Sequence, residues 1–463
     1  MTMNLTDTEQ SPQRDTACGS CIPTCMLVTV GCAKNEVDTD RMRALLVDSG
    51  FKETDSPVEA DVIIVNTCSF LGVATQESVE TVLELASISA DEGHARVIMC
   101  GCVPSRYGNE LAGELPEVDA FVPADKEDRI VSVACDVLGI PMEATPHGSR
   151  VLRTIEGASA YVKISDGCDR WCTFCAIPAI RGPYASRPAE AILDEVRMLM
   201  EGGVREVVLI GQDTGVWGSD LEGDHDLAWL LLEVAQVVRP YRGWVRVLYL
   251  QPEGMTDRLI GVLRDCPEVL PYIDIPIQHC VEHVLRDMGR SGSHDELASL
   301  FSRLRKEIPG LVLRTTGLVG FPGETEDDLE ELCEFIEDVG FDYTSVFAYS
   351  AEEGTIAAKL PNQVTEDELT ERAQRLQDVA ERLGFASTAR RMGGEFDVII
   401  DGVEETDEGM ELIGHAWFQA PDCDGAVHIE SGEASVGDVV RCKIVDAFCY
   451  ELVGVMVKTH LGE

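Results

Sequence analysis

The sequence has few basic residues for its length. It contains 37 Lys and Arg against 83 Asp and Glu, which gives a formal net charge of −46. A protein that binds mainly nucleic acid needs a basic face to displace counterions from phosphates, so this balance argues against such a partner. It favours a basic protein partner, attracted by long-range steering. Because acidic residues occur in every segment, acidity spread over the whole surface explains the charge equally well.

The sequence also lacks a long apolar run and a secretory start. No stretch reaches the ~20 apolar residues of a membrane span. The opening MTMNLTDTEQSPQRD has no basic region followed by an apolar one. We therefore expect a cytoplasmic protein with no membrane segment. In that reducing compartment the 17 cysteines are poor candidates for a disulfide framework, and metal binding is the better explanation.

The first part of the chain alternates strands and helices. Residues 1–25 are polar and lack periodicity, which predicts a disordered tail. Apolar runs then predict three strands, at 27–31, 61–68 and 96–102. A helix is expected at about 35–49. A second helix carries its apolar face on Val79, Val82, Leu83 and Ala86. This alternation predicts a parallel sheet.

A second series of strands and helices follows. Six runs predict strands near 161–164, 206–211, 245–250, 272–275, 311–320 and 343–349. The helices between them include 189–201 and one that starts after the N-cap residue Thr325. Six strand–helix units favour a partial barrel over a sandwich. A helix at about 366–383 leads to short strands from about 391 to 458, which predict a small β-barrel.

The sequence therefore predicts an α/β protein with three folded domains after the tail at 1–25. The first, at 26–145, is an α/β domain with a parallel sheet. The second, at 154–385, is a partial (β/α) barrel. The third, at 388–460, is the small β-barrel.

Three cysteines follow the first barrel strand, in Gly167-Cys168-Asp-Arg-Trp-Cys172-Thr-Phe-Cys175. Three thiolates this close together can hold three irons of a [4Fe–4S] cluster and leave the fourth iron open. A structural zinc site usually needs a fourth Cys or His nearby, and none lies close. The spacing, with Phe174 before the last cysteine, resembles the radical SAM superfamily. The resemblance implies that S-adenosylmethionine (SAM) binds the open iron and is cleaved by one electron to a 5′-deoxyadenosyl radical.

Cys32, Cys68 and Cys102 form a second candidate set. Taken singly, each fits a buried cysteine that acts as a small hydrophobic residue. Together they lie at the carboxyl ends of three predicted parallel strands, the edge where open α/β sheets place their ligands. Three thiolates that converge there would hold a second cluster, also with an open iron.

From about residue 27 to its end, the chain resembles the radical SAM methylthiotransferase family. The cysteine signatures are Gly31-Cys32-Ala-Lys-Asn-Glu-Val-Asp38, Asn66-Thr-Cys68-Ser-Phe70 and Gly101-Cys102. The barrel motifs are Gly182-Pro-Tyr-Ala-Ser-Arg-Pro188, Gly211-Gln-Asp-Thr214, Asp274-Ile-Pro-Ile-Gln-His279 and Val319-Gly-Phe-Pro-Gly-Glu-Thr325. The C-terminal segment resembles the family's TRAM domain. The resemblance thus identifies the three predicted domains as a methylthiotransferase N-terminal domain, a radical SAM core and a TRAM domain.

Within the family the chain resembles the RimO type, which modifies small-subunit ribosomal protein twelve, more than the branch that modifies tRNA adenosine. The first signature has Ala-Lys-Asn after the cysteine, where the tRNA branch typically has Gln-Met. The segment Gly414-His-Ala-Trp-Phe-Gln-Ala-Pro-Asp-Cys-Asp-Gly425 resembles the RimO-type TRAM motif. From Arg391 onward 16 acidic residues stand against four basic ones, a net charge of −12. This acidic barrel, beside its Ala-Pro-Asp-Cys-Asp-Gly425 turn, suits a basic ribosomal protein better than RNA.

The resemblance implies insertion of a methylthio group at the β-carbon of a protein aspartate, with two SAM molecules and two [4Fe–4S] clusters. The metal ligands would be Cys32, Cys68, Cys102, Cys168, Cys172 and Cys175, and the SAM-binding residues Phe174, Gly211 and Gln212. We identify no general base, since homolysis reaches an unactivated C–H bond and acid–base chemistry does not. The partners would be ribosomal protein twelve, an electron donor and a sulfur donor. Three alternatives remain: a tRNA adenosine methylthiotransferase, a radical SAM enzyme of another reaction type and a non-catalytic iron–sulfur carrier.

Other cysteines are not assigned as cluster ligands. Cys18, Cys21 and Cys25 lie in the predicted tail, with no apolar frame to fix them. Cys100 shares a strand face with Cys102 by period-two alternation, and it is the cysteine most easily mistaken for a ligand. Cys333 lies on the apolar face of a predicted helix and is assigned to the core.

Overall fold

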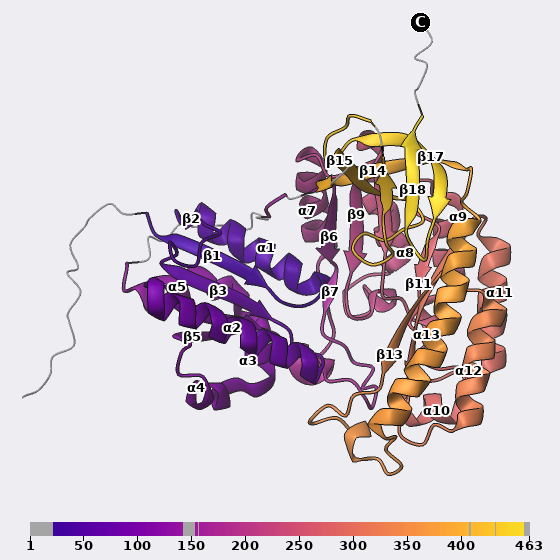
Figure 1. The fold of residues 1–463 in the computed structure, drawn as a ribbon, viewed down its shortest axis with the longest axis horizontal. Helices are drawn as coiled ribbons and strands as arrows, with labels where there is room; N and C mark the ends of the chain where they lie inside the picture. The colour runs from indigo at the N-terminus through magenta and orange to yellow at the C-terminus, as the bar shows by residue number, and fades with distance from the viewer. Residues whose placement is uncertain (1–21, 142–152, 156, 407–408, 431, 458–463) are drawn as a thin grey trace, which may run out of the picture.

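The computed structural model describes residues 22–141, 153–155, 157–406, 409–430 and 432–457. Figure 1 shows three parts in chain order: an indigo-to-purple α/β unit, a magenta-to-orange partial barrel and a yellow small barrel packed on it. The three-part α/β architecture predicted from the sequence is confirmed. Cys18 and Cys21 lie outside the described residues. No helix in the described ranges is both long and apolar enough to span a membrane.

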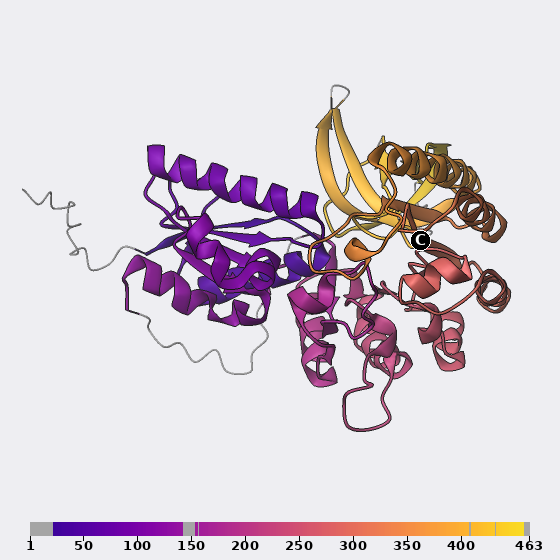
Figure 2. The same ribbon diagram turned by 90° about the horizontal axis from the view of Figure 1, so that it is seen from below.

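The N-terminal unit is a parallel five-stranded sheet in the order β2-β1-β3-β4-β5. Its strands are β1 Thr24–Thr29, β2 Lys52–Glu53, β3 Val62–Thr67, β4 Arg96–Gly101 and β5 Ala120–Pro123. One face is covered by α1 Ala33–Asp48 and α5 Ile130–Leu138. The other is covered by α2 Gly72–Glu92, α3 Cys102–Tyr107 and α4 Leu111–Glu114. Figure 2 shows the sheet between its two helical layers, which explains why all six residues of β3 are buried.

Two expectations for this unit are wrong. The sequence places Cys25 in a disordered tail, but Cys25 lies in β1 with a fully buried side chain. Pairing with β2 and a hydrogen bond from the Thr24 backbone N–H to Asp61 (2.8 Å) fix the start of this strand. Leu83 was expected on the inward face of α2 but is 37% exposed, and Leu85, at 9%, takes its place.

The central part is a partial barrel of six parallel strands. Two sheets, in the orders β10-β9-β6 and β11-β12-β13, are joined by a bridge between Val245 and Val269. The strands are β6 Ser159–Lys163, β9 Glu206–Ile210, β10 Trp244–Val247, β11 Tyr272–Asp274, β12 Val312–Val319 and β13 Tyr343–Ala348. The helices on its outside are α7 Ala189–Glu201, α8 Leu227–Val238, α9 Asp257–Asp265, α10 Glu282–Asp287, α11 His294–Glu307 and α12 Glu326–Val339. Thr325 caps α12, as the sequence predicts.

The connecting helix α13 (Glu366–Ala389) is longer than the 366–383 predicted. Its extra turn is held by the small barrel, since Thr388 Oγ1 donates to Phe448 O (2.8 Å). Gly384, the residue after the predicted end, lies inside the helix, where an added Cβ would be 2.5 Å from the Tyr450 ring. The glycine therefore permits a close contact between domains instead of ending the helix.

The C-terminal part is a closed barrel in the order β14-β15-β16-β18-β17. Its strands are β14 Glu395–Thr406, β15 Gly409–Ala416, β16 Val427–Ile429, β17 Val439–Ala447 and β18 Leu452–Met456. One apolar cluster joins its interior to side chains of the partial barrel, including Val208 and Tyr272 beside Val398 and Phe418. The two barrels therefore share a core and fold against each other.

A buried charged network crosses this interface. Arg246 on β10 and Glu206 on β9 are both fully buried, and Arg246 Nε donates to Glu206 Oε1 at 2.6 Å. His415 of the small barrel contacts Glu206 Oε2 at 3.0 Å and Asp401 Oδ2 at 2.6 Å. Burial alone would lower the pKa of His415, but hydrogen bonds to Asp401 and Glu206 more than offset it and raise the pKa to about 9.

This network predicts a pH-dependent contribution to stability. Because the folded pKa of His415 lies above its ordinary 6.5, the contribution is fully present below about pH 6.5 and is lost as the pH rises through about 9. The shift corresponds to roughly 3 kcal/mol. Denaturant midpoints of the wild type and His415→Gln should therefore differ most at pH 6 and converge by pH 10. A difference that stays constant over this range would show that His415 is not protonated in the fold.

Candidate active site between the two cysteine sets

Cys32, Cys68 and Cys102 come together at one edge of the N-terminal sheet. Cys32 is the N-cap residue of α1, Cys68 follows β3, and Cys102 is the first residue of α3. Their strands β1, β3 and β4 are adjacent and parallel, so all three carboxyl ends meet. Cys32 and Cys102 also lie at helix N-termini, where the backbone dipole favours a thiolate.

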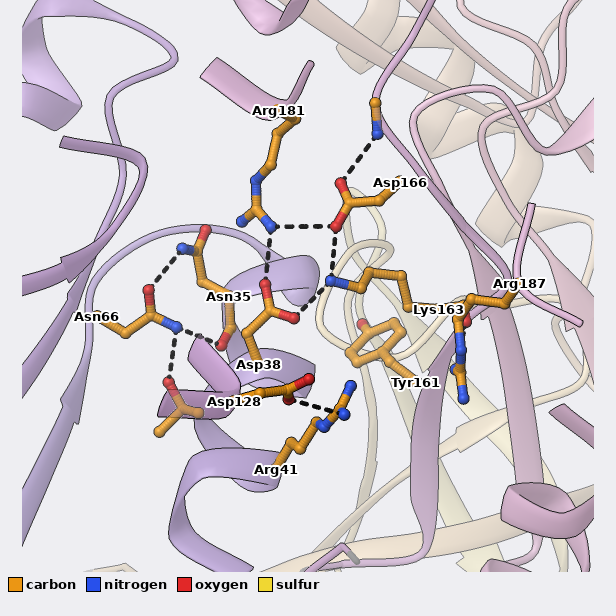
Figure 3. Close-up of polar contacts among 12 residues, drawn as sticks. Asn35, Asp38, Arg41, Asn66, Asp128, Tyr161, Lys163, Asp166, Arg181 and Arg187 are labelled. Carbon is orange, nitrogen blue, oxygen red and sulfur yellow. Dashed lines mark hydrogen bonds and ion pairs between the residues drawn. The ribbon is translucent and has the colours of Figure 1, made fainter. Parts of the chain in front are cut away.

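The backbone at this edge is closely packed. At Gly31 (φ +137°) an added Cβ would lie 2.7 Å from Asn35 Oδ1 and 2.8 Å from the Cys68 Cβ. Asn35 and Asn66 hydrogen bond to each other (3.1 Å), as Figure 3 shows, and Asn35 Oδ1 accepts from the Cys32 backbone N–H. The glycine and the two asparagines therefore fix the loops that carry Cys32 and Cys68.

The electrostatics of this set fit a metal cluster. Burial, and after it the neighbouring Cys102 and Cys32 thiolates, raise the pKa of Cys68 to about 11. Because converging thiolates repel one another, the thiols stay protonated. A bound cation offsets that repulsion, and its binding releases the thiol protons. Cys100 does not join them, since it is fully buried in the apolar layer beneath α1 and α5 and its Sγ contacts Val65 O.

Cys168, Cys172 and Cys175 lie on one loop between β7 (Ser165–Asp166) and α6 (Ile177–Arg181). Arg170 inside the loop pairs with buried Asp213 (2.5 Å), just after β9. The Thr173 backbone N–H donates to Met288 O (2.9 Å), and the Thr173 carbonyl accepts from the Ala357 N–H (2.9 Å). Contacts with the barrel therefore fix the conformation of the loop.

This set also fits a cluster. Burial, and after it the Cys172 and Cys168 thiolates, raise the pKa of Cys175 to about 12. Three thiols on one short loop can each bind a different iron of a [4Fe–4S] cluster.

Of the three residues assigned to SAM, Phe174 lies in this loop, and Gly211 and Gln212 lie beside the strand β7 that precedes it. Gly211 is buried directly after β9, where an added Cβ would collide with Ser165 Oγ. Gln212 Nε2 donates to Asp166 Oδ1 (3.1 Å), while its Oε1 is buried without a hydrogen-bond partner. An orphaned buried acceptor suits a cationic ligand such as the ammonium group of SAM. Phe174 is half-buried and packs against the barrel core.

A buried ion network joins the two cysteine sets. Asp38 on α1 accepts from Lys163 Nζ (2.5 Å) and from Arg181 Nη1 (2.8 Å), as Figure 3 shows. Asp166, two residues before Cys168, accepts from the same two cations at 2.8 and 3.5 Å. Burial alone would lower the pKa of Lys163, yet the carboxylates of Asp38 and Asp166 raise it above its ordinary value. The network therefore ties the first helix of one domain to the cysteine loop of the other.

Sequence reasoning missed these residues, although signals exist. Lys163 interrupts the apolar run Tyr161-Val-Lys-Ile, and a charge there needs a buried partner. Lys34, in the first cysteine signature, is also buried, and its Nζ lies 3.2 Å from the centre of the Tyr249 ring in the barrel. Both residues make contacts between domains that sequence periodicity cannot show.

The structure corrects the role given to the turn at 420–425. His415, Phe418 and Asp424 are at most 2% exposed, so the segment at 414–425 packs against the partial barrel. Asp424 accepts from Arg314 Nε (3.1 Å) and from the Tyr272 hydroxyl. Asp424 therefore helps to bind the two barrels together, whereas Asp422 of the same turn stays exposed, and further exposed acids lie elsewhere on the small barrel.

Comparisons with known proteins match a stretch in each of the three parts of the chain. Residues 24–123 match the uncharacterized protein family UPF0004, residues 162–336 the radical SAM superfamily, and residues 392–457 the TRAM domain. The radical SAM methyltransferase TsrM from Kitasatospora setae, solved with cobalamin and a [4Fe–4S] cluster, has 16% sequence identity to this chain. It superposes with a TM-score of 0.53 over 71% of this chain and 75% of its own, which indicates a shared fold.

Three sequence relatives carry the same description, ribosomal protein uS12 methylthiotransferase RimO. The protein of Trichlorobacter lovleyi is 42% identical over 441 residues, which cover 93% of this chain and 98% of the relative. That of Geobacter sulfurreducens is 41% identical over 440 residues, with the same coverage. That of Natranaerobius thermophilus is 38% identical over 438 residues, again covering 93% and 98%.

Proposed function

This chain belongs to the RimO family of radical SAM methylthiotransferases, and we propose that it inserts a methylthio group at the β-carbon of an aspartate in ribosomal protein uS12. It is a sulfur-transferring radical SAM enzyme that uses SAM and a [4Fe–4S] cluster. The observation that carries the proposal is the junction between its domains. One buried ion network connects α1, whose N-cap residue is Cys32, to the segment just before Cys168.

Each cysteine set would hold one cluster. Cys168, Cys172 and Cys175 would bind the SAM-cleaving cluster, and Cys32, Cys68 and Cys102 a second one. When bound, the first supplies the electron for SAM cleavage and the second a site for the sulfur to be transferred. The reaction also needs an external electron donor and an external sulfur donor.

The protein's own residues would position these groups. The Arg170–Asp213 pair fixes the cysteine loop, and Gln212, with its unpartnered Oε1, would accept from the SAM ammonium group. We assign no residue as a general base, because an unactivated C–H bond has no proton that a base at neutral pH can remove. The fold's task is to hold both clusters within reach of one substrate carbon.

The substrate would be recognised through charge. The C-terminal segment from Arg391 carries a net charge of −12, and its exposed acids include Glu404, Glu405, Glu430 and Glu433. Such a surface attracts a basic ribosomal protein and repels RNA. A ribosomal substrate would place the enzyme in the cytoplasm. The second candidate function is a tRNA adenosine methylthiotransferase. For that enzyme, added positive charge on the small barrel should strengthen substrate binding.

Charge reversal on the small barrel tests this assignment. Changing Glu404, Glu405, Glu430 and Glu433 to Lys reduces the net charge of the segment from −12 to −4. Association with purified uS12 at low salt should slow by about tenfold, because exposed charges act mainly on encounter. The rate should also vary less with salt, as measured by stopped-flow kinetics across a salt series.

A matched control changes four exposed acids of α2, on the far domain: Glu77, Glu84, Asp91 and Glu92. This variant alters the total charge equally and should retain most of the wild-type association rate. Transfer RNA is tested in parallel with all three proteins. Tight, salt-sensitive tRNA binding by the wild type, without affinity for uS12, would overturn the substrate assignment in favour of the tRNA enzyme.

A further inference from the structure

A cysteine, a histidine and a glutamate outside both cysteine sets meet in the helical layer of the partial barrel. Cys280 lies in the connection from β11 to α10, His294 is the first residue of α11, and Glu331 lies on α12. The Cys280 Sγ, a ring nitrogen of His294 and a carboxylate oxygen of Glu331 all lie within 4.8 Å of one another. Helices α11 and α12 contact each other and lie side by side in Figure 1. The fold therefore brings three metal-binding groups together from three separate elements.

The local packing holds each of these side chains in place. Cys280 is fully buried, and its Sγ lies 3.7 Å from the backbone oxygen of Glu331. Ser293 caps α11 directly before His294. The His294 ring packs edge-on against Phe335, with 5.1 Å between ring centres, and its Nδ1 lies 3.1 Å from Glu331 Oε1. The three donors are therefore arranged by contacts of the surrounding helices.

The types and spacing of these donors suit zinc. Thiolate, imidazole and carboxylate are the groups that bind zinc in proteins, whereas Mg²⁺ and Ca²⁺ prefer sets of oxygens. In a tetrahedral zinc site with bonds of about 2.1 Å, a nitrogen and an oxygen ligand lie about 3.4 Å apart. The 3.1 Å between His294 Nδ1 and Glu331 Oε1 is close to that spacing. That pair alone is an ordinary hydrogen bond, and the buried thiol beside it completes a set of three ligands.

The site is also open to a metal ion. The side chains of His294 and Glu331 are 35% and 43% exposed, so an ion from solvent reaches the buried thiol between them. In the described part of the chain, the ion-pair partner of Glu331 is this histidine, so no lysine or arginine competes for the carboxylate. A water molecule can fill the fourth position of the tetrahedron.

We propose that Cys280, His294 and Glu331 form a zinc site that ties α11 and α12 to the connection between β11 and α10. Zinc binding releases the proton of the Cys280 thiol to solvent and replaces the hydrogen bond between His294 and Glu331. A ligand that binds only the folded state stabilises that state, so bound zinc stabilises this part of the helical layer. The inference is independent of the proposed function, because neither cysteine set contributes a ligand.

Zinc binding is measured on the full chain after anaerobic iron–sulfur reconstitution, by equilibrium dialysis and elemental mass spectrometry. The wild type should bind one zinc ion with micromolar or tighter affinity that depends on all three residues. Cys280→Ala, His294→Ala and Glu331→Gln should each weaken binding of that ion at least tenfold, because each removes one of three protein ligands. His294→Cys exchanges one zinc ligand for another and should stay within about tenfold of the wild type. Zinc bound elsewhere on the chain is common to all variants and cancels in the comparison.

A neighbouring histidine provides the matched control. His283 and Asp328 form a second imidazole–carboxylate pair beside α12 (3.3 Å), and neither residue belongs to a three-ligand group among the described residues. His283→Ala should therefore retain the zinc affinity of the wild type. Cobalt(II) is the spectroscopic probe: a thiolate-to-cobalt absorption band should appear in the difference spectrum between the wild type and Cys280→Ala.

Thermal unfolding gives a second readout. Zinc should raise the melting temperature of the wild type and of His283→Ala, but not that of His294→Ala. His294 and Glu331 are partly exposed, so their variants test the proposal if Cys280→Ala, which removes a fully buried side chain, does not fold. Zinc affinity that is unchanged in His294→Ala and Glu331→Gln, or equally weakened in His283→Ala, would overturn the proposal. Wild-type affinity in the millimolar range would also overturn it, because such binding is adventitious.

Discussion

Replacing Cys168, Cys172 and Cys175 with Ala is expected to abolish reductive cleavage of SAM. The three thiols share the loop between β7 and α6, so we expect all three to bind one cluster. Two such centres imply about eight irons per chain after anaerobic reconstitution, and the variant should retain about four. Iron is measured by colorimetric assay, and 5′-deoxyadenosine by chromatography after addition of SAM and dithionite.

A cysteine from the core serves as the control for this result. Cys333 lies on the inward face of α12, and Cys333→Ala should retain both iron and SAM cleavage. An iron content near four in both the wild type and the triple variant would contradict the assignment of two clusters. Far-ultraviolet circular dichroism confirms that each protein is folded before iron is compared.

Replacing Cys32, Cys68 and Cys102 should separate the two activities. The loop of Cys168 is held by Arg170–Asp213 and by Thr173 contacts within the barrel, so it does not need the N-terminal thiols. Formation of 5′-deoxyadenosine should remain within about twofold of the wild type, while methylthio transfer falls below detection. We expect this because the sulfur would be presented from the N-terminal cluster.

Cys100→Ala is the matched control, because Cys100 lies on β4 two residues before Cys102. Its thiol is buried in the apolar layer beneath α1 and α5, away from the cluster of Cys102, Ala176 and Ile180, so the change should cost about 1 kcal/mol of stability and leave the iron content intact. Loss of SAM cleavage in a folded Cys32, Cys68 and Cys102 variant would show that the two centres are not separable.

The sequence was sufficient for the features that depend on local patterns. Each barrel strand appears as an apolar run, and Thr325 is a cap because its hydroxyl meets a backbone N–H three residues on. The convergence of Cys32, Cys68 and Cys102 followed from the rule that adjacent parallel strands end at one edge. These inferences need only short-range geometry and a sheet topology.

The contacts between domains could not be predicted in the same way. Asp38 and Lys163 are 125 residues apart, and the hydrophobic periodicity of neither segment predicts that they form an ion pair. Asp424 looked like part of an exposed acidic turn, but it is buried against Arg314 and Tyr272. A composition argument counts charges and cannot show which of them a tertiary interface covers.

A single reaction mixture decides whether the enzyme transfers a methylthio group to uS12 or to tRNA. Reconstituted enzyme, SAM with a deuterated methyl group, dithionite and a sulfide donor are incubated with uS12 and tRNA together, and both products are analysed by mass spectrometry. We expect a labelled methylthio group on the β-carbon of one uS12 aspartate, accompanied by 5′-deoxyadenosine, and unmodified tRNA. Formation of 5′-deoxyadenosine with the label in tRNA adenosine, or with no labelled product on uS12, would contradict it.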